Sequence, residues 1–221
     1  MSQPEISLVV LISGSGSNLQ AIIDATQNGT IPAKISAVIC NKESAYGLTR
    51  ATNAGIATEV ISHKDFDSRE HFDQALQAKI DHFSPDLVVL AGFMRILTPE
   101  FVRHYSDRML NIHPSLLPKY RGLNTHQRAI DAGEDEHGVT VHFVTEELDG
   151  GPNVLQAQVP ITPDETAESL AAKVLIQEHQ IYPRAIKWFA QGRLKMIGNQ
   201  ASLDQTLLSE SGEQHVNGAS E

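Results

Sequence analysis

The sequence predicts an α/β protein with a Rossmann-like, mostly parallel twisted sheet, helices on both of its faces and an antiparallel strand pair in the C-terminal half. In the first half, short apolar runs alternate with amphipathic helical patterns, as in repeated strand–helix–strand units. In the second half, two longer strand patterns flank the turn sequence LDGGP. We therefore expect one domain over residues 1–195, followed by a polar, disordered tail over residues 196–221.

Five apolar runs predict the parallel strands. They are mostly continuous rather than alternating, which is typical of strands that are covered on both faces. The fifth ends in the stretch RMLNIHP, just before Pro114. The runs are ISLVVLI (6–12), AKISAVICN (33–41), IATEVIS (56–62), DLVVLAGF (86–93) and the run ending at His113.

Helical patterns separate these runs and continue in the C-terminal half. Ser17 is the expected N-cap of the first helix and Gly29 its stop. Pro183 is expected to kink or interrupt the last and longest helix. The helical ranges are 17–29, 45–55, 67–83 and 165–193, and the antiparallel strands are expected over 137–147 and 153–161.

The composition indicates an acidic globular protein. Lys and Arg number 17 against 27 for Asp and Glu, a formal net charge of −10, which disfavours a nucleic-acid partner. No apolar stretch approaches the roughly 20 residues that cross a membrane, and the N-terminal segment lacks the basic region of a signal peptide. With Cys40 as its single cysteine, the protein is expected to be cytoplasmic.

The segment SGSGSNLQ (13–20) lies between the first strand and the first helix, where glycines let the backbone approach a ligand. A dinucleotide fingerprint does not fit, because Leu19 occupies the third glycine position and the second strand ends in CNK without an acidic residue. We therefore expect no NAD. The alternatives are a phosphate monoester held by the N–H groups of Gly16, Ser17 and Asn18, or a turn that opens a helix and binds nothing.

Asn111 and His113 lie two positions apart at the end of a strand, so their side chains are expected on the same face. The carboxyl ends of parallel strands line ligand sites in doubly wound sheets. An amide N–H and an imidazolium N–H can both donate to an oxygen that becomes negative during acyl transfer. Asp149 is the leading carboxylate to orient the imidazole.

Each of these residues also has a structural interpretation. A histidine before proline often serves as a hydrogen-bonding group, and Asp149 in a DGG sequence is a common turn former. We find no activated nucleophile, so the implied chemistry is direct transfer between two bound substrates. No histidine pair has the H-E-x-x-H spacing and there is no cysteine cluster, so a metal site is not expected. His137 and His142 lie five apart on a strand pattern, so at most one of them faces the site.

Five segments together resemble the folate-dependent formyltransferase family, over nearly the whole chain to about residue 195. The NIHPSLLP and DGGP elements are shared by proteins that handle 10-formyltetrahydrofolate. The GSGSN element is similar to the branch that formylates glycinamide ribonucleotide. The segments are LISGSGSNLQAII (11–23), VVLAGFMRIL (88–97), LNIHPSLLPKYRG (110–122), HGVTVHFVTEELDGGP (137–152) and QEHQIYPRAIKWF (177–189).

The resemblance implies a formyltransferase fold and an enzyme of purine biosynthesis. Its formyl donor would be 10-formyltetrahydrofolate, a co-substrate, and its acceptor the amine of glycinamide ribonucleotide, without metal or NAD. Only small-molecule partners are implied, with a monomer or homodimer. By position, the catalytic residues would be Asn111, His113 and Asp149; the ribonucleotide site Gly16, Ser17, Asn18 and Glu178; and the folate site Arg69, Met94, Arg95, Ile96, Leu97, Asn111, Thr145, Glu146, Glu147, Leu148 and Asp149.

The chain departs from the family pattern at Leu175, three residues before Glu178, where bacterial members carry a glutamine. This change puts one polar contact to the ribonucleotide in question. Arg121 and Asn124 lie at positions of the loop 120–124 that we interpret as tolerant of change.

Three other functions compete. A formyltetrahydrofolate hydrolase would add a regulatory N-terminal domain and lack the GSGSN loop. A methionyl-tRNA formyltransferase would have a further C-terminal domain and a basic surface. A non-catalytic nucleotide-binding module would leave Asn111, His113 and Asp149 without a shared purpose.

Overall fold

The computed structural model describes residues 5–215. They divide into two compact units, with the boundary between Asn111 and Ile112 inside strand β5. Eight strands form a mostly parallel sheet in the order β11-β7-β6-β5-β4-β1-β2-β3, and three form a separate antiparallel sheet, β10-β9-β8. This topology confirms the predicted fold class. Within residues 5–215, none of the helices combines the length and apolar character needed to cross a membrane.

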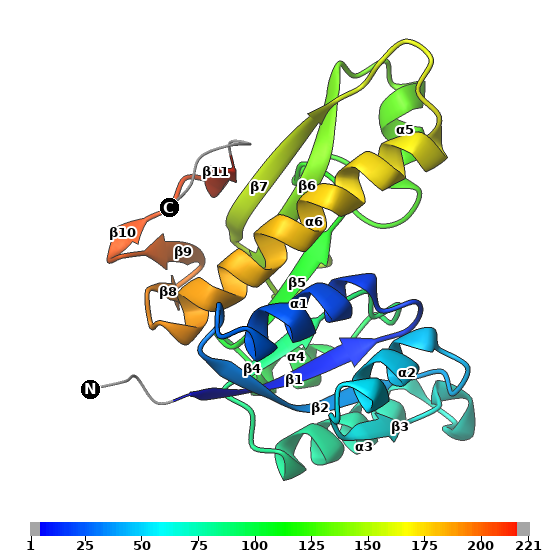
Figure 1. Ribbon diagram of the computed structural model, residues 1–221, viewed down its shortest axis with the longest axis vertical. Helices are drawn as coiled ribbons and strands as arrows, with labels where there is room; N and C mark the ends of the chain where they lie inside the picture. Colours follow the sequence, from blue (N-terminus) through cyan, green and yellow to red (C-terminus); the bar gives the residue numbers. More distant parts are fainter. Residues whose placement is uncertain (1–4, 216–221) are drawn as a thin grey trace. The chain divides into compact units, whose positions relative to one another are not determined.

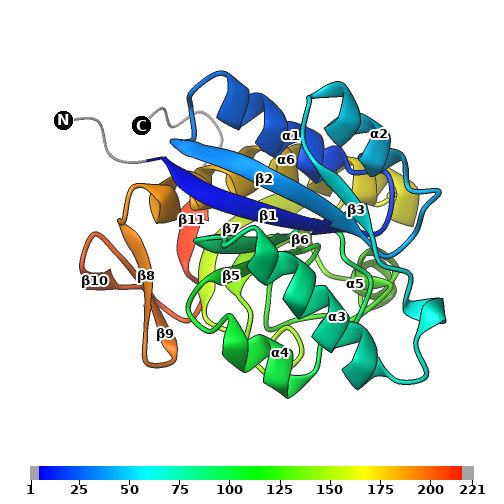
Figure 2. The same ribbon diagram turned by 90° about the horizontal axis from the view of Figure 1, so that it is seen from below.

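The first unit consists of parallel strands with helices on both faces. Figure 2 shows α1 and α2 on one side of β1 and β2, and α3 and α4 on the other. The predicted apolar runs form the core, and residues Leu8–Ile12 of β1 are fully buried. The elements are β1 Ile6–Ile12, α1 Ser17–Gln27, β2 Ala33–Cys40, α2 Tyr46–Asn53, β3 Thr58–Val60, the 3₁₀ helix η1 His63–Asp65, α3 Arg69–His82, β4 Leu87–Leu90, α4 Pro99–His104 and β5 Met109–His113.

The second unit contains the predicted antiparallel pair, with α6 lying along β6 and β7 (Figure 1). Its N-terminal turn is fixed by a capping box between Thr166 and Ser169. The elements are α5 Thr125–Asp131, β6 Glu136–Phe143, β7 Asn153–Pro160, α6 Ala167–Ala190, β8 Leu194–Ile197, β9 Gln200–Leu203, β10 Thr206–Leu207 and β11 Glu213–His215.

Several local predictions differ from the structure. The helix α1 begins at Ser17 itself, and its N-cap is Gly16 in the left-handed region (φ 70°), with no side-chain cap. Strand β6 ends at Phe143, so residues 144–152 form a loop rather than continuing the strand. Pro183 lies inside α6 without interrupting it; Tyr182 and Ala185, on either side of it, are fully buried, so packing outweighs the lost hydrogen bond.

The segment 196–221, expected as a disordered tail, contains strands in its described part; residues 216–221 lie outside the described residues. These strands have two to four residues each, too few to show a period in the sequence. Strand β11 pairs in parallel with the edge of β7. It is anchored by Arg184, whose Nη1 donates to Nδ1 of His215 at 2.9 Å.

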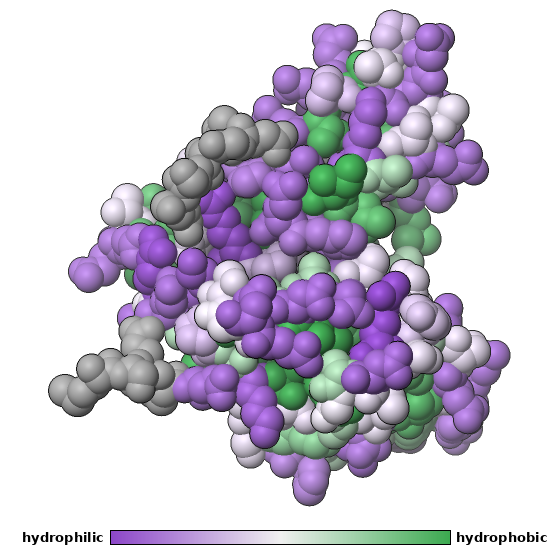
Figure 3. Space-filling model, in the orientation of Figure 1, coloured by the Kyte–Doolittle hydropathy of each residue, from purple (hydrophilic) through white to green (hydrophobic). Residues whose placement is uncertain are grey.

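The face of the molecule in Figure 3 is largely hydrophilic, in keeping with the acidic composition.

Candidate active site

Strand β5 carries Asn111 and His113 two residues apart at its C-terminal end, as the sequence predicts. Asn111 pairs in parallel register with Leu90 of β4, and its side chain is half-buried. His113 is buried. Residues two apart on a pleated strand point to the same face of the sheet, so the strand places this amide and this imidazole on one face.

The His113 ring lies between two acceptors. Its Nδ1 is 3.5 Å from Oδ2 of Asp149, and its Nε2 donates to the carbonyl oxygen of Tyr120 at 3.0 Å. A carboxylate and a carbonyl oxygen can only accept hydrogen bonds, so both partners suit N–H groups of the ring. The ring therefore faces an acceptor at each of its two nitrogens, which fixes its orientation at the end of the strand.

Asp149 is held in place by the backbone of two loops. Its Oδ2 accepts from the N–H of Gly122 at 2.9 Å, and its own φ of 49° lies in the left-handed region that aspartate tolerates. A Cβ at Gly151 would lie 1.9 Å from the carbonyl oxygen of Phe143, so this position accepts only glycine. Asp149 thus combines the predicted turn-forming role with an orientation toward His113.

A second histidine, His142, lies on the other side of the Asp149 carboxylate, with Nε2 3.9 Å from Oδ1. Burial lowers the pKa of His142, so the ring is neutral near pH 7. Its Nδ1 donates to the carbonyl oxygen of Phe143 at 2.8 Å, which leaves Nε2 without a proton in the neutral ring. The neutral His142 ring therefore adds no positive charge beside Asp149.

The other predicted histidine, His137, belongs to a different cluster. Its Nε2 lies 3.2 Å from Nδ1 of His126 on α5. Burial, and secondarily the neighbouring His126, lowers the pKa of His137 to about 4. Only His142 lies beside Asp149, in agreement with the expectation that at most one of the pair faces the site.

A pocket of about 400 Å³ lies beside Asp149 in the second unit. Its walls come from the loop around Pro118, from the glycines after Asp149 and from the C-terminal segment 199–210. Water in this pocket would have direct access to the Asp149 region, which gives a proton a route to solvent.

In the first unit, the segment expected to be either an anion site or a simple turn forms the loop before α1. Gly16 ends the loop in a left-handed conformation, and the helix starts at Ser17 with no acidic residue in its first turn. The N–H groups of a first helical turn have no partner within the helix, and the helix dipole adds partial positive charge there. Gly16, Ser17 and Asn18 occupy this position.

The predicted folate segment 94–97 lies in the loop between β4 and α4, and Ser13 fixes its beginning. The Ser13 hydroxyl accepts from the N–H of Met94 at 2.8 Å and donates to Oδ1 of Asn41 at 2.6 Å. Met94 and Ile96 are largely exposed, at 60% and 58%. Their apolar side chains are thus available to a ligand ring, and a buried serine links this loop to the end of β1.

Two further predicted folate residues, Arg69 and Arg95, lie close to the buried Asp73. Burial raises the pKa of Asp73, against the opposing effects of a hydrogen bond from Thr98 and of both arginines. Oδ2 of Asp73 accepts from the N–H of Thr98 at 2.6 Å, which fixes the other end of the loop.

The remaining predicted residues lie in the second unit. Thr145 to Leu148 belong to the Asp149 loop, where Glu147 pairs with Arg121 and Leu148 is 51% exposed. Glu178 is buried on α6, and Leu175 lies three residues earlier, where a helix places it on nearly the same face.

Sequence reasoning missed two backbone contacts and one pair of buried side chains. The Tyr120 carbonyl, the Gly122 N–H and the Ser13–Asn41 pair make contacts that no residue pattern signals. Strand alternation indicated that at most one of His137 and His142 faces the site, but it could not show that this one is His142 or that it lies beside Asp149.

Comparisons with known proteins agree with these features. Residues 6–186 match the family described as Formyl transferase. The chain is 58% identical over 199 residues to phosphoribosylglycinamide formyltransferase of Escherichia coli, covering 90% of this chain and 94% of that protein. It is 55% identical over 205 residues to the Haemophilus influenzae protein of that name, covering 93% and 97%. The solved phosphoribosylglycinamide formyltransferase from Coxiella burnetii, in complex with CHES, matches with a TM-score of 0.91 and 56% identity, covering 95% of this chain and 99% of that one.

Proposed function

Because the chain belongs to the formyl transferase family, we propose that it transfers the formyl group of 10-formyltetrahydrofolate to the amine of glycinamide ribonucleotide, a step of purine biosynthesis. The observation that carries the catalytic assignment is the His113–Asp149 pair at the end of the strand that also holds Asn111. This arrangement supplies oxyanion donors and a proton-carrying group without a nucleophilic side chain.

The reaction is a direct transfer. The amine nitrogen attacks the formyl carbon and forms a tetrahedral oxyanion, the bond from that carbon to N10 then breaks, and the proton lost by the amine balances the one gained at N10. The Asn111 amide and the His113 N–H donate to the oxygen as it becomes negative. The products are the formylated ribonucleotide and tetrahydrofolate.

Asp149 acts through His113 and through water. Its carboxylate orients the His113 ring and stabilises positive charge on it during proton transfer, and the pocket beside it offers a route by which water relays the proton. In the free protein the Nε2–H of His113 is donated to the Tyr120 carbonyl, so substrate binding exchanges this hydrogen bond for one to the formyl oxygen.

The substrates occupy the predicted loops. The phosphate of the ribonucleotide binds the N–H groups of Gly16, Ser17 and Asn18, while Glu178 contacts its glycinamide or ribose end. The folate binds Arg69, the loop 94–97 and the stretch Thr145–Asp149, with the pterin hydrogen-bonded to the backbone of 95–97. Leu175 leaves one polar contact to the ribonucleotide unfilled.

We also propose that residues 1–195 act as one catalytic domain in the cytoplasm. The matched family spans residues 6–186 and so includes parts of both compact units, which supports one domain.

The test compares turnover with and without the acceptor. The purified chain is incubated with 10-formyltetrahydrofolate, and the folate product is followed by absorbance with glycinamide ribonucleotide present or omitted. Formyl transfer predicts product only when both substrates are present. Turnover without the amine would instead identify a hydrolase, and no turnover in either mixture would identify a non-catalytic binding module.

A further inference from the structure

The loop that precedes α1 packs against the N-terminal part of α2. Gly47 N–H donates to the carbonyl oxygen of Gly14 at 3.0 Å. The two backbones are so close that a Cβ on Gly16 would lie 2.6 Å from the Cα of Gly47. A Cβ on Gly47 would lie 3.2 Å from both the carbonyl oxygen of Gly14 and the Cα of Gly16. The position of α2 therefore determines the shape of this loop.

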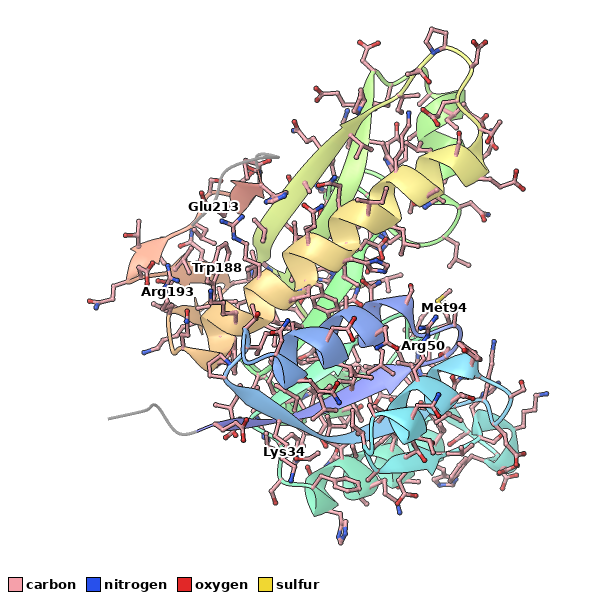
Figure 4. All side chains as sticks on the ribbon, viewed as in Figure 1. Lys34, Arg50, Met94, Trp188, Arg193 and Glu213 are labelled. Carbon is pink, nitrogen blue, oxygen red and sulfur yellow. The ribbon has the colours of Figure 1, made fainter. Side chains whose placement is uncertain are left out.

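Arg50, one turn further along α2, makes the second contact with the loop. Its Nε donates to the carbonyl oxygen of Ser15 at 2.9 Å, and its Nη1 donates to Oε1 of Gln20 on α1 at 3.3 Å. The guanidinium lies 4.9 Å from the centre of the Tyr46 ring. Figure 4 shows Arg50 beside the end of α1 at which that helix begins.

These contacts orient the N–H groups that face a ligand. The Ser15 carbonyl and the Gly16 N–H belong to one trans peptide unit, in which C=O and N–H point in opposite directions. An arginine that holds the Ser15 oxygen toward α2 therefore turns the Gly16 N–H away from α2. The same contact points the negative end of the Ser15 carbonyl dipole toward α2, so that it does not repel an anion bound on the opposite side of the loop.

The charge of Arg50 adds to this effect. Among residues 5–215, no carboxylate forms an ion pair with Arg50, although three hydrogen-bonding or ring partners hold its guanidinium in place. A fixed positive charge in a protein with a net charge of −10 raises the local potential for a dianionic phosphate.

We propose that Arg50 is a positioning residue for the phosphate of the acceptor ribonucleotide: it aims the Gly16 N–H through the Ser15 carbonyl and supplies an unneutralised charge beside the loop. This inference rests on the proposed binding of that phosphate at Gly16, Ser17 and Asn18.

Steady-state kinetics of Arg50→Met test the role. The variant keeps much of the apolar stem but removes the donors and the charge. We expect the KM for glycinamide ribonucleotide to rise about tenfold, equivalent to ~1.4 kcal/mol. The kcat and the KM for 10-formyltetrahydrofolate should stay within about twofold of the wild-type values. The reason is that Arg50 is expected to affect the binding of the ribonucleotide alone. Arg50→Lys, which restores the charge without the fork geometry, should give an intermediate KM.

Arg103→Met is the matched control, because it removes the same charge from an exposed position of α4 in the same unit, where Arg103 pairs with Glu100. Equal ribonucleotide KM values in Arg50→Met and Arg103→Met would overturn the proposal, and so would equal increases in the KM of both substrates.

A binding measurement separates this proposal from the location on which it rests. Inorganic phosphate is titrated into the ¹⁵N-labelled protein, and the amide resonances of Gly16, Ser17 and Asn18 are followed. Shifts in the wild type with weaker saturation in Arg50→Met support both ideas. Shifts with equal affinity in the two proteins would keep the location and overturn the role of Arg50. No shift in the wild type would overturn the location, and the role of Arg50 with it.

Discussion

At the residue scale, the His113 ring is held between the Asp149 carboxylate and the Tyr120 carbonyl. Asp149 in turn receives the Gly122 N–H on one oxygen and faces the neutral His142 ring with the other. Of the two histidines beside Asp149, His113 is the closer, with its Nδ1 3.5 Å from the carboxylate against 3.9 Å for Nε2 of His142. The neutral form of His142 results from its burial, and its Nδ1 donates to the Phe143 carbonyl oxygen.

The first prediction concerns the oxyanion donors. Asn111→Ala and His113→Ala should each lower kcat by at least about 100-fold, as for the loss of one donor to a developing oxyanion. Stopped assays with both substrates saturating measure this loss, and circular dichroism checks that each variant is folded. A folded variant with a rate near that of the wild type would show that its residue has been assigned the wrong role.

The second prediction concerns the charge of Asp149. Asp149→Asn keeps the shape and an oxygen for the Gly122 N–H, but it removes the negative charge beside the His113 ring. Because that charge stabilises positive charge on the ring during proton transfer, we expect lower activity. The measurement is kcat of wild type and variant with both substrates saturating, and circular dichroism checks that the variant is folded. An unchanged kcat would argue against the His113–Asp149 pairing.

At the element scale, the ends of strands and the loops that follow them carry the site. The Ser13 hydroxyl, just after β1, makes two hydrogen bonds. It accepts from the N–H of Met94, in the loop after β4, and donates to Asn41, just after β2. Ser13 and Asn41 are both buried, so these bonds are protected from competition by water. The loop 94–97 therefore takes its position from two parallel strands.

The third prediction follows from this link. Ser13→Ala leaves the Met94 N–H and the Asn41 amide oxygen without their partner, which costs about 1–3 kcal/mol if the groups stay buried. The loop should become less ordered, and the KM for 10-formyltetrahydrofolate should rise by about fivefold to tenfold, or ~1–1.4 kcal/mol. Kinetics with varied folate measure the change.

Ser36→Ala is a suitable control for this variant. It also removes a serine hydroxyl in the first unit, one paired with Ser7 at 2.7 Å on the strand surface. Its KM for the folate should not change. If Ser13→Ala and Ser36→Ala have the same folate KM, the Ser13 link has no role in forming the folate loop.

Element type could be predicted from the sequence wherever burial produced a long apolar run or a helical period. The run ISLVVLI predicts β1 with the bounds that the structure has, and the DGG turn predicts the antiparallel pair. The sequence analysis did not predict the short elements α4, α5 and β8–β11, because seven residues or fewer do not complete a recognisable pattern. The side chains Asn111, His113 and Asp149 could be predicted from chemistry and family resemblance, whereas the backbone partners at Tyr120 and Gly122 depend on loop conformation.

At the scale of the whole molecule, three buried or half-buried histidines make folding sensitive to acid. Burial lowers the pKa of His126, His137 and His142, that of His137 to about 4 from an ordinary value of 6.5. Below pH 6.5 the unfolded chain therefore binds protons that the folded protein does not. The stability contributed by neutral histidines is complete above this pH and is lost as the pH falls toward 4.

The fourth prediction tests this dependence through His137. The free energy of unfolding should fall by up to about 1.4 kcal/mol per pH unit for each such histidine over this range. In His137→Gln, which cannot titrate, the fall between pH 6.5 and 4 should be smaller by about one histidine's share. Urea unfolding at pH 7, 6 and 5 measures the slope. His82→Gln, at an exposed position, should keep the wild-type slope, and a wild-type slope in His137→Gln would refute the prediction.

Strand β11 has only three residues, and it pairs with Leu155–Ala157 along the edge of β7. So short a pairing opens at a much lower cost than global unfolding, and each opening uncovers a template for another chain. Self-association at high concentration would then follow the frequency of this local opening rather than the overall stability of the protein. Hydrogen exchange measures it directly: the β7 amides that pair with β11 should exchange faster than those that pair with β6, and equal protection would mean that the edge stays closed.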